Sequence, residues 1–252
     1  MPTQNNTLPV PTRALVLGDV HHNTPSFELA CARALDAGCQ IILQVGDFGY
    51  FPGTDFGDEF LLAAEKTLAV HGLYCVVIRG NHDNEPALAS LERDASGMGI
   101  ISTHMRYAPT GLHWNWSGVE FLAAGGAVSV DRASRVEGHN YWSSESLSYA
   151  EVNACIDAGH ADVILAHDCP DGIDVIGAKK PDTDSAAHRR CVSAIVEAVQ
   201  PSLVFHGHYH VRASTQLNTE SHSCQIESLG RDGSLEDHFY ILDLAAVATS
   251  AP

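Results

Sequence analysis

Side chains that can bind metals or transfer protons follow directly after short apolar segments of this sequence. One such segment, 73–78, leads into Gly80-Asn81-His82-Asp83. The end of this expected strand therefore carries an amide oxygen, an imidazole and a carboxylate that could orient the imidazole. Sites of α/β folds lie at such strand ends, although the same residues could also form a simple turn.

Four other expected strands end in side chains of the same kinds. Residues at positions i and i+2 of an extended segment project to the same side, so such pairs can reach one point. Carboxylate, amide oxygen and imidazole suit Mn²⁺, Fe, Zn²⁺ or Ni²⁺, and no thiolate accompanies them. Together the donors are too many for one ion and suit two ions about 3.5–4 Å apart that share a carboxylate and a hydroxide. The eight donors are Asp19, His21, Asp47, Asn81, His82, His167, His208 and His210.

The first elements expected around these side chains alternate between strand and helix. A β-α-β-α-β order predicts a parallel sheet with right-handed crossovers. Strands are expected at 13–17, 40–45 and 73–78, with helices at about 26–37, capped by Ser26, and at about 58–70.

The pattern changes after a short helix expected at about 86–93. Short strands at 100–102, 104–107, 112–116 and 119–123 are expected to extend the sheet in antiparallel or mixed fashion. The irregular segment 125–147 is long, and such loops are usually functional or disordered. A helix is expected from the capping box Ser148–Glu151 to about Gly159, followed by a strand at 162–166. A second helix from about 184 to Pro201 precedes a strand at 202–205. Strands over about 213–244 are expected to close a second sheet.

Composition indicates one domain with a well-filled core. The chain has 252 residues, 45% of them apolar, and a formal net charge of −17, which argues against binding to long nucleic acid or to anionic membranes. Its seven cysteines form no C-x-x-C pair, which favours free thiols in a reducing compartment. No membrane span or signal pattern is evident, so we expect a cytoplasmic protein, with residues 1–12 as a loose leader and self-association possible.

The ordered donors resemble a known family. The series Asp19-x-His21, Gly46-Asp47, Gly80-Asn81-His82-Asp83, His167 and Gly207-His208-x-His210 is similar to that of the calcineurin-like metallophosphoesterase superfamily, in particular its small bacterial and phage-type phosphodiesterases. The resemblance covers residues from about 15 to 210. It implies an α/β fold in which a two-sheet β-sandwich is flanked by helices, in four layers α/β/β/α, with a dimetal site at one end of the sandwich.

The resemblance also implies a role for each donor. The ions would be two divalent transition metals, with Mn²⁺ favoured and Fe, Zn²⁺ or Ni²⁺ as alternatives. His82 would contact the phosphate and protonate the leaving oxygen, with Asp83 as its partner, and Asn81 would also approach the substrate. Arg132 or Arg135 could reach a substrate phosphate, or could belong to a solvated loop. In the same scheme the first ion takes Asp19, His21 and His210, the second takes Asn81, His167 and His208, and Asp47 bridges both.

Departures from the family narrow the expected activity. His22 stands where the family usually has glycine, and Asp47 lacks the following Asp-Arg-Gly of the family's protein phosphatases. We therefore expect a phosphodiesterase that acts on cyclic or other small nucleotides through a metal-bridging hydroxide, with the aromatic loop 50–56 and Trp142 facing a base or ester group. The alternatives are a phosphomonoesterase or protein phosphatase of the same superfamily, and a non-catalytic scaffold. Scaffold members lose ligands or the acid histidine, and here all are present.

Overall fold

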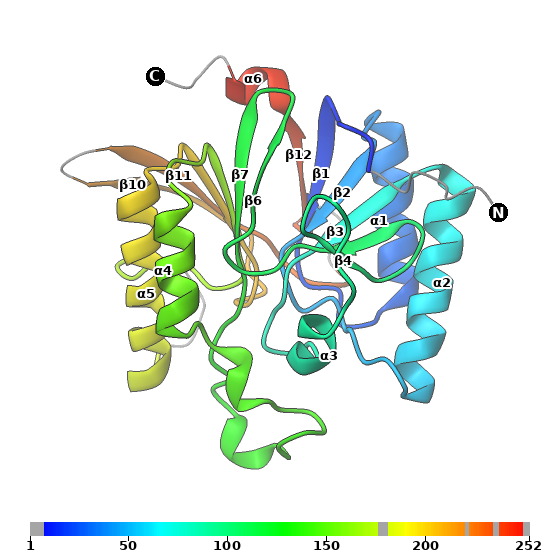
Figure 1. Cartoon of the computed structure of the whole chain (residues 1–252), viewed down its shortest axis with the longest axis horizontal. Helices are drawn as coiled ribbons and strands as arrows, with labels where there is room; N and C mark the ends of the chain where they lie inside the picture. The colour runs from blue at the N-terminus through cyan, green and yellow to red at the C-terminus, as the bar shows by residue number, and fades with distance from the viewer. Residues whose placement is uncertain (1–7, 176–180, 220–221, 234–236, 249–252) are drawn as a thin grey trace.

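A computed structural model describes residues 8–175, 181–219, 222–233 and 237–248 of the chain. Two mixed six-stranded sheets pack face to face, and helices cover the outer face of each (Figure 1), which confirms the expected four-layer α/β/β/α sandwich. The first sheet has the order β12-β1-β2-β3-β5-β4, formed by Phe239–Asp243, Arg13–Leu17, Ile41–Gln44, Tyr74–Val77, Met105–Tyr107 and Gly99–Ile100. The second has the order β10-β11-β9-β8-β7-β6, formed by Ala213–Asn218, Ser223–Ser228, Leu203–His206, Val163–Ala166, Val119–Ala124 and His113–Trp116.

Side-chain alternation along the central strands builds the layers. Val16 on β1, Leu43 on β2 and Val76 on β3 are in register and belong to the core between the sheets. Their neighbours in sequence point the other way, and Leu15 and Leu17 pack under the helices of the first sheet. Strands buried on both faces read as continuous apolar runs, which is why these strands could be found in the sequence.

The helices begin at side-chain caps, and two of them start earlier than expected. Asn23, not Ser26, caps α1, because the Asn23 side chain accepts a hydrogen bond from the Ser26 N–H at 3.2 Å. Thr54 caps α2, and the expected capping box Ser148–Glu151 is confirmed at α4. The helices are α1 (Thr24–Asp36), α2 (Asp55–His71), α3 (Glu85–Ala89), α4 (Tyr149–Asp157), α5 (Thr183–Val199) and α6 (Leu244–Ala248).

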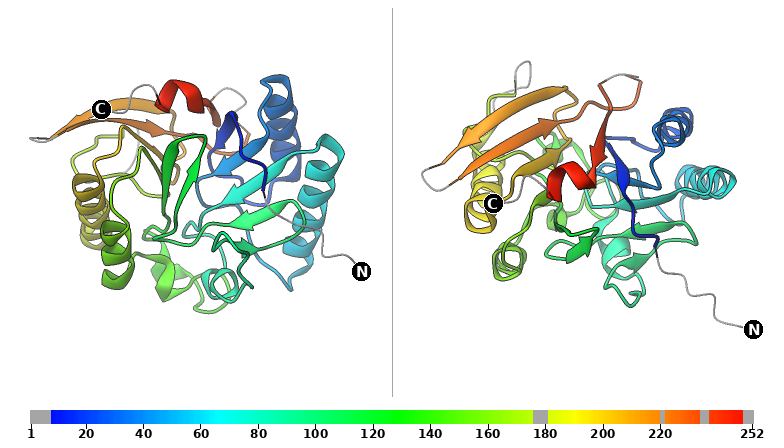
Figure 2. Two further views of the ribbon diagram at one scale, coloured as in Figure 1. Left: turned by 45° about the horizontal axis from the view of Figure 1, so that its top comes forward. Right: turned by 90° about the horizontal axis from the view of Figure 1, so that it is seen from above.

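Two expectations about sheet membership are only partly right. Strands β4 and β5 extend the first sheet as expected, but β6 and β7 begin the second sheet. In the C-terminal part, β10 and β11 join the second sheet, whereas β12 pairs antiparallel with β1 of the first (Figure 2). The alternation of side chains along a strand does not tell which of two sheets the strand joins. By pairing with β1, β12 covers a strand edge that would otherwise be open.

The remaining segments complete the sandwich. Segment 125–147 contains two short 3₁₀ helices, η1 (Arg132–Ser134) and η2 (Ser143–Glu145). In the expected N-terminal leader, Leu8 packs on the core and the Pro11 carbonyl accepts a hydrogen bond from Ser117, while residues 1–7 lie outside the described part. All seven cysteines are free, as expected. None of the described helices has the length and apolar character of a membrane span.

Candidate metal centre

The parallel strands of both sheets deliver the expected donors to one end of the sandwich. Asp19 and His21 follow β1, Asp47 follows β2, and Asn81 and His82 follow β3 of the first sheet. The second sheet contributes His167 after β8, and His208 and His210 after β9. Donors that are far apart in the sequence therefore meet where the two sheets face each other.

Two glycines let the loops of the centre approach closely. A Cβ atom on Gly80 would lie 2.0 Å from Asp47 Oδ1, and one on Gly207 would lie 2.0 Å from Asp19 Oδ1. Any side chain at either position would displace a carboxylate. The glycines that accompany the donors in the sequence thus have a steric reason.

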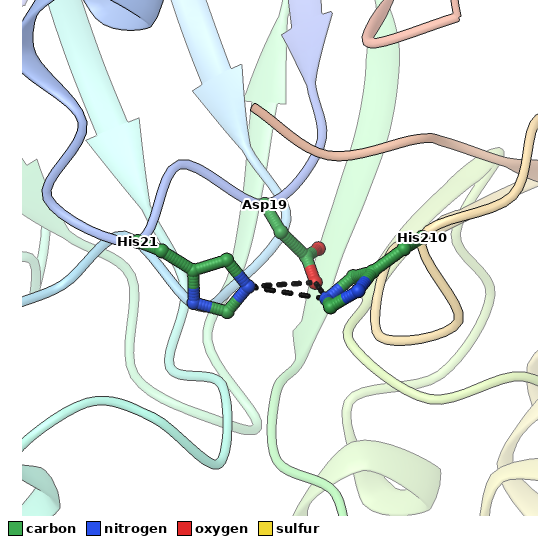
Figure 3. Close-up of side chains that lie close together, drawn as sticks. All are labelled: Asp19, His21 and His210. Atoms are coloured by element: carbon green, nitrogen blue, oxygen red, sulfur yellow. Dashed lines mark hydrogen bonds and ion pairs between the residues drawn. The ribbon is translucent and has the colours of Figure 1, made fainter. Parts of the chain in front are cut away.

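The first donor group consists of Asp19, His21 and His210 (Figure 3). The Nε2 atoms of His21 and His210 lie 3.1 Å apart, and Asp19 Oδ2 lies 3.0 Å from His210 Nε2 and 3.7 Å from His21 Nε2. Asp19 is fully buried, whereas both imidazoles are partly exposed at the surface of the centre. Three donor atoms of this kind around one point can hold a divalent ion.

The second donor group consists of Asp47, His167 and His208, with Asn81 beside it. His167 Nδ1 donates to the Val45 carbonyl at 2.8 Å, so Nε2 is the ring nitrogen that faces the other donors. That Nε2 lies 3.1 Å from Asn81 Oδ1 and 3.3 Å from Asp47 Oδ1. An imidazole nitrogen and two oxygens that converge in this way fit a divalent cation once the imidazole has lost its proton. Within the described part of the chain, the two groups hold the seven predicted metal ligands.

The electrostatics of the second group also favour a positive charge. Burial lowers the pKa of His167, but the adjacent Asp47 carboxylate outweighs it and raises the pKa to about 10. Burial raises the pKa of Asp47, yet His167 and His82 hold that pKa well below its usual range. In the absence of metal, a proton on His167 takes the place of the cation, so metal binding should displace that proton.

The backbone of the centre is strained. Seven non-glycine residues of the described chain have positive φ; four of them are donors of the centre and a fifth, His22, directly follows a donor. Left-handed backbone is unfavourable for residues with a Cβ and is concentrated at functional sites. The five are His21, His22, Asp47, His208 and His210, with φ between 47° and 68°.

His82 lies beside the donors, next to an arginine. Its backbone N–H donates to Asp47 Oδ1 at 2.7 Å, and its ring centroid lies 5.2 Å from that of His21. Two guanidinium nitrogens of Arg135 lie 3.0 and 2.8 Å from its ring nitrogens, and Asp131 pairs with Arg135 at 2.8 Å. Arg135 therefore contacts the expected acid histidine.

Arg132, the other arginine expected to reach a phosphate, is engaged elsewhere. Its guanidinium donates to the Ser129 carbonyl at 2.9 Å and pairs with Asp182 and Asp184 at the start of α5. These three bonds hold the guanidinium at the start of α5. Of the alternatives expected for Arg132, its contacts favour a role within the loop over contact with a substrate phosphate.

The expected pairing of Asp83 with His82 is also wrong. Asp83 is buried, and its carboxylate ties the loops after β2 and β3 together through backbone N–H groups. Burial and then the Asp47 charge raise the pKa of Asp83, and three of these N–H groups lower it again. The four donors are the N–H groups of Asp47 and Gly80, on Oδ2 at 3.0 and 2.8 Å, and those of Gly49 and Tyr50, on Oδ1 at 2.9 Å each.

We expect Asp83→Asn to lower the free energy of unfolding by about 2–4 kcal/mol. Whichever way the amide is turned, its NH₂ group faces two N–H donors, so two hydrogen bonds to a charged group are lost. Urea denaturation with and without added metal measures the effect. The control is Asp36→Asn, an exposed residue at the end of α1, which should change stability by less than about 0.5 kcal/mol. Equal stability of the two variants would contradict the role of Asp83.

Sequence reasoning missed two residues that orient Asn81. The Asn81 amide NH₂ donates to Ser129 Oγ at 3.0 Å, and Ser129 in turn donates to Glu145 through Oγ and N–H, both at 2.6 Å. This chain of bonds leaves Asn81 Oδ1 facing His167. Ser129 lies 48 positions from Asn81, and no local pattern marks the contact.

Fold and donor set together define a metal-dependent phosphoesterase. The chain belongs to the calcineurin-like phosphoesterase family, whose model matches residues 12–212. A structure of TT1561 from Thermus thermophilus is similar with a TM-score of 0.55 and 16% identity, covering 94% of this chain and 96% of that one. A dimetal phosphatase from Danio rerio is similar with a TM-score of 0.56 and 12% identity, covering 92% of each chain. At these identities the structures support the fold alone. Among curated proteins, no match is found.

Proposed function

We propose that this protein is a two-metal phosphodiesterase that acts on small nucleotides. The proposal rests on two donor groups that lie side by side and share contacts. The backbone N–H of His208, in the second group, donates to Asp19 of the first at 3.1 Å. Burial raises the pKa of Asp47, but His167 of the second group, His82 and His21 of the first group together lower it, which supports a position of this carboxylate between the groups. We therefore assign Asp47 as the ligand common to both ions, preferably Mn²⁺.

The chain's own residues position and protonate the substrate in this proposal. When bound, two divalent ions neutralise phosphate charge and supply hydroxide at neutral pH. Asn81, fixed by Ser129, presents its amide oxygen to the second ion. His82 donates the proton that the leaving oxygen needs. Burial lowers the pKa of His82. The Asp47 charge raises this pKa and the Arg135 charge lowers it further, so the net shift is downward. A lower pKa makes the protonated ring a stronger acid.

The preference for diesters is inferred from the ion pairs that the arginines around the centre form with acidic residues. A monoester dianion needs more neutralising cations than a diester anion. Arg79 is buried and pairs with Glu151 at 2.9 Å, while Arg132 and Arg135 pair with aspartates. With the net charge of −17, these pairs leave the surroundings of the centre poorly suited to a second phosphate charge.

The test compares esters on metal-loaded protein. We expect bis(4-nitrophenyl) phosphate and cyclic nucleotides to be hydrolysed with higher kcat/KM than 4-nitrophenyl phosphate in Mn²⁺, Ni²⁺ and Zn²⁺. Chelator-treated protein, with each metal then added back, is the control. A clear advantage of the monoester with all three metals would replace the diesterase proposal with a phosphomonoesterase.

Seven free cysteines support a location in a reducing compartment such as the cytoplasm. We include that location in the proposal.

A further inference from the structure

A small cavity of about 220 Å³ opens beside the candidate metal centre. His21, a proposed ligand, and His82, the proposed acid, both contribute to its wall. The cavity therefore adjoins the position where the reacting phosphate must lie. Segments that follow β1, β2 and β3 supply most of the wall, and the loop of segment 125–147 supplies His139 and Asn140.

Three rings form one side of this cavity. The ring of Phe56 lies 5.1 Å from that of His22 and 5.5 Å from that of Phe51, between centroids. The ring of Trp142 lies 5.9 Å from that of Phe51 and does not line the cavity. Phe56 is 47% exposed although it belongs to an aromatic cluster. An aromatic ring left open next to a reaction centre can stack on a planar ligand, which would bury the exposed face.

His22 belongs to this wall and to neither donor group. It holds a left-handed backbone with φ 52° and packs against Phe56 and Phe51. A glycine at this position would adopt that backbone more readily, so the imidazole is present despite a conformational cost. Its contacts explain the departure from the family pattern: the ring extends an aromatic surface.

The part of the lining that comes from segment 125–147 is polar. The Asn140 side-chain oxygen accepts a hydrogen bond from the Val136 N–H at 2.7 Å, and we assign the amide NH₂ as the group that contacts a ligand. Arg135 donates to the Asn140 carbonyl at 3.3 Å and also contacts His82, which links this part of the lining to the proposed acid. A planar ligand ring with hydrogen-bond acceptors on its edge can bond to such polar groups, whereas a purely apolar ligand ring cannot.

We propose that this cavity, the ring pocket (His22, Phe51, Phe56, His139 and Asn140), binds the base of a nucleotide phosphoester. Its volume is below the roughly 300–1,000 Å³ of pockets that enclose whole drug-sized ligands, so it fits one planar ring system while sugar and phosphate lie outside. The inference rests on the proposed function and names the part of the substrate that the protein recognises.

The test compares two ligands that differ only in the base. AMP and ribose 5-phosphate are titrated calorimetrically into Mn²⁺-loaded protein. Stacking on an aromatic side chain should make AMP bind at least about 5-fold more tightly. Phe56→Ala should remove most of that difference and leave ribose 5-phosphate unchanged. Leu62→Ala, which truncates a 72% exposed residue of the same helix α2, is the matched control and should behave as the wild type.

A second variant tests the same wall from another segment. His22→Asn keeps a residue that tolerates left-handed backbone and removes the ring. Elemental analysis should show unchanged metal, and AMP should again lose affinity relative to ribose 5-phosphate. Equal binding of the two ligands to the wild type, or equal weakening of both by Phe56→Ala, would overturn the ring pocket. Failure to hydrolyse any ester with any metal would instead overturn the proposed function.

Discussion

The Asp47→Asn variant should lose most of its bound metal and about 10³-fold in kcat. One carboxylate serves both proposed ions, so its neutralisation weakens two sites at once. Metal ions typically contribute several kcal/mol of transition-state stabilisation, and each 1.36 kcal/mol corresponds to about tenfold in rate. Asparagine keeps an oxygen that can accept the His82 N–H, so the loop should keep its conformation.

Elemental analysis of the purified variant and kinetics at saturating metal measure these effects. Asp157→Asn, which neutralises an exposed carboxylate at the end of α4, should keep full metal content and activity. Two ions per chain in Asp47→Asn would rule out Asp47 as the shared ligand.

His82→Ala should retain its metal and lose about 10²–10⁴-fold in kcat on esters with poor leaving groups, the usual range for general acid catalysis. The loss should be smaller on nitrophenyl esters, because that leaving group departs without a proton. Alanine keeps the backbone N–H that donates to Asp47, so the donor groups should remain in place.

Assays of alkyl and nitrophenyl diesters side by side separate two contributions of His82, binding of the phosphate and protonation of the leaving group. His71→Ala at the end of α2 is the control and should leave both rates unchanged. Equal losses on both esters would show that His82 binds the phosphate without protonating the leaving group.

Those features of the centre that depend on local sequence could be predicted. An apolar run followed by glycine and then Asp, Asn or His marks the end of a buried strand, and parallel strands bring such ends together. Asp19, Asp47 and Asn81 could thus be placed at one edge of the first sheet from their positions in the sequence alone. The fold followed from the same runs, with boundaries displaced by two or three residues where Asn23 and Thr54 cap helices earlier than expected.

Features that depend on contacts between distant segments could not be predicted. Asp83 stands next to His82 in the sequence, which suggested a pair, but its carboxylate turns towards backbone N–H groups of the preceding loop. Arg132 and Arg135 are three positions apart, yet one reaches α5 and the other reaches His82. Strand β12 could equally have joined either sheet. In each case the deciding partner lies far along the chain, where periodicity and spacing carry no information.

The division of the ligands between the two sheets has a consequence for how the protein matures. His21 and His210 meet in one donor group although they are 189 positions apart, and the second group also draws on both sheets. A nascent chain that has formed only the first sheet offers no complete group. Complete donor groups therefore form only when the sandwich has closed, so we expect tight metal binding to follow the docking of the two sheets. Metal uptake by newly made protein would then report the completion of folding.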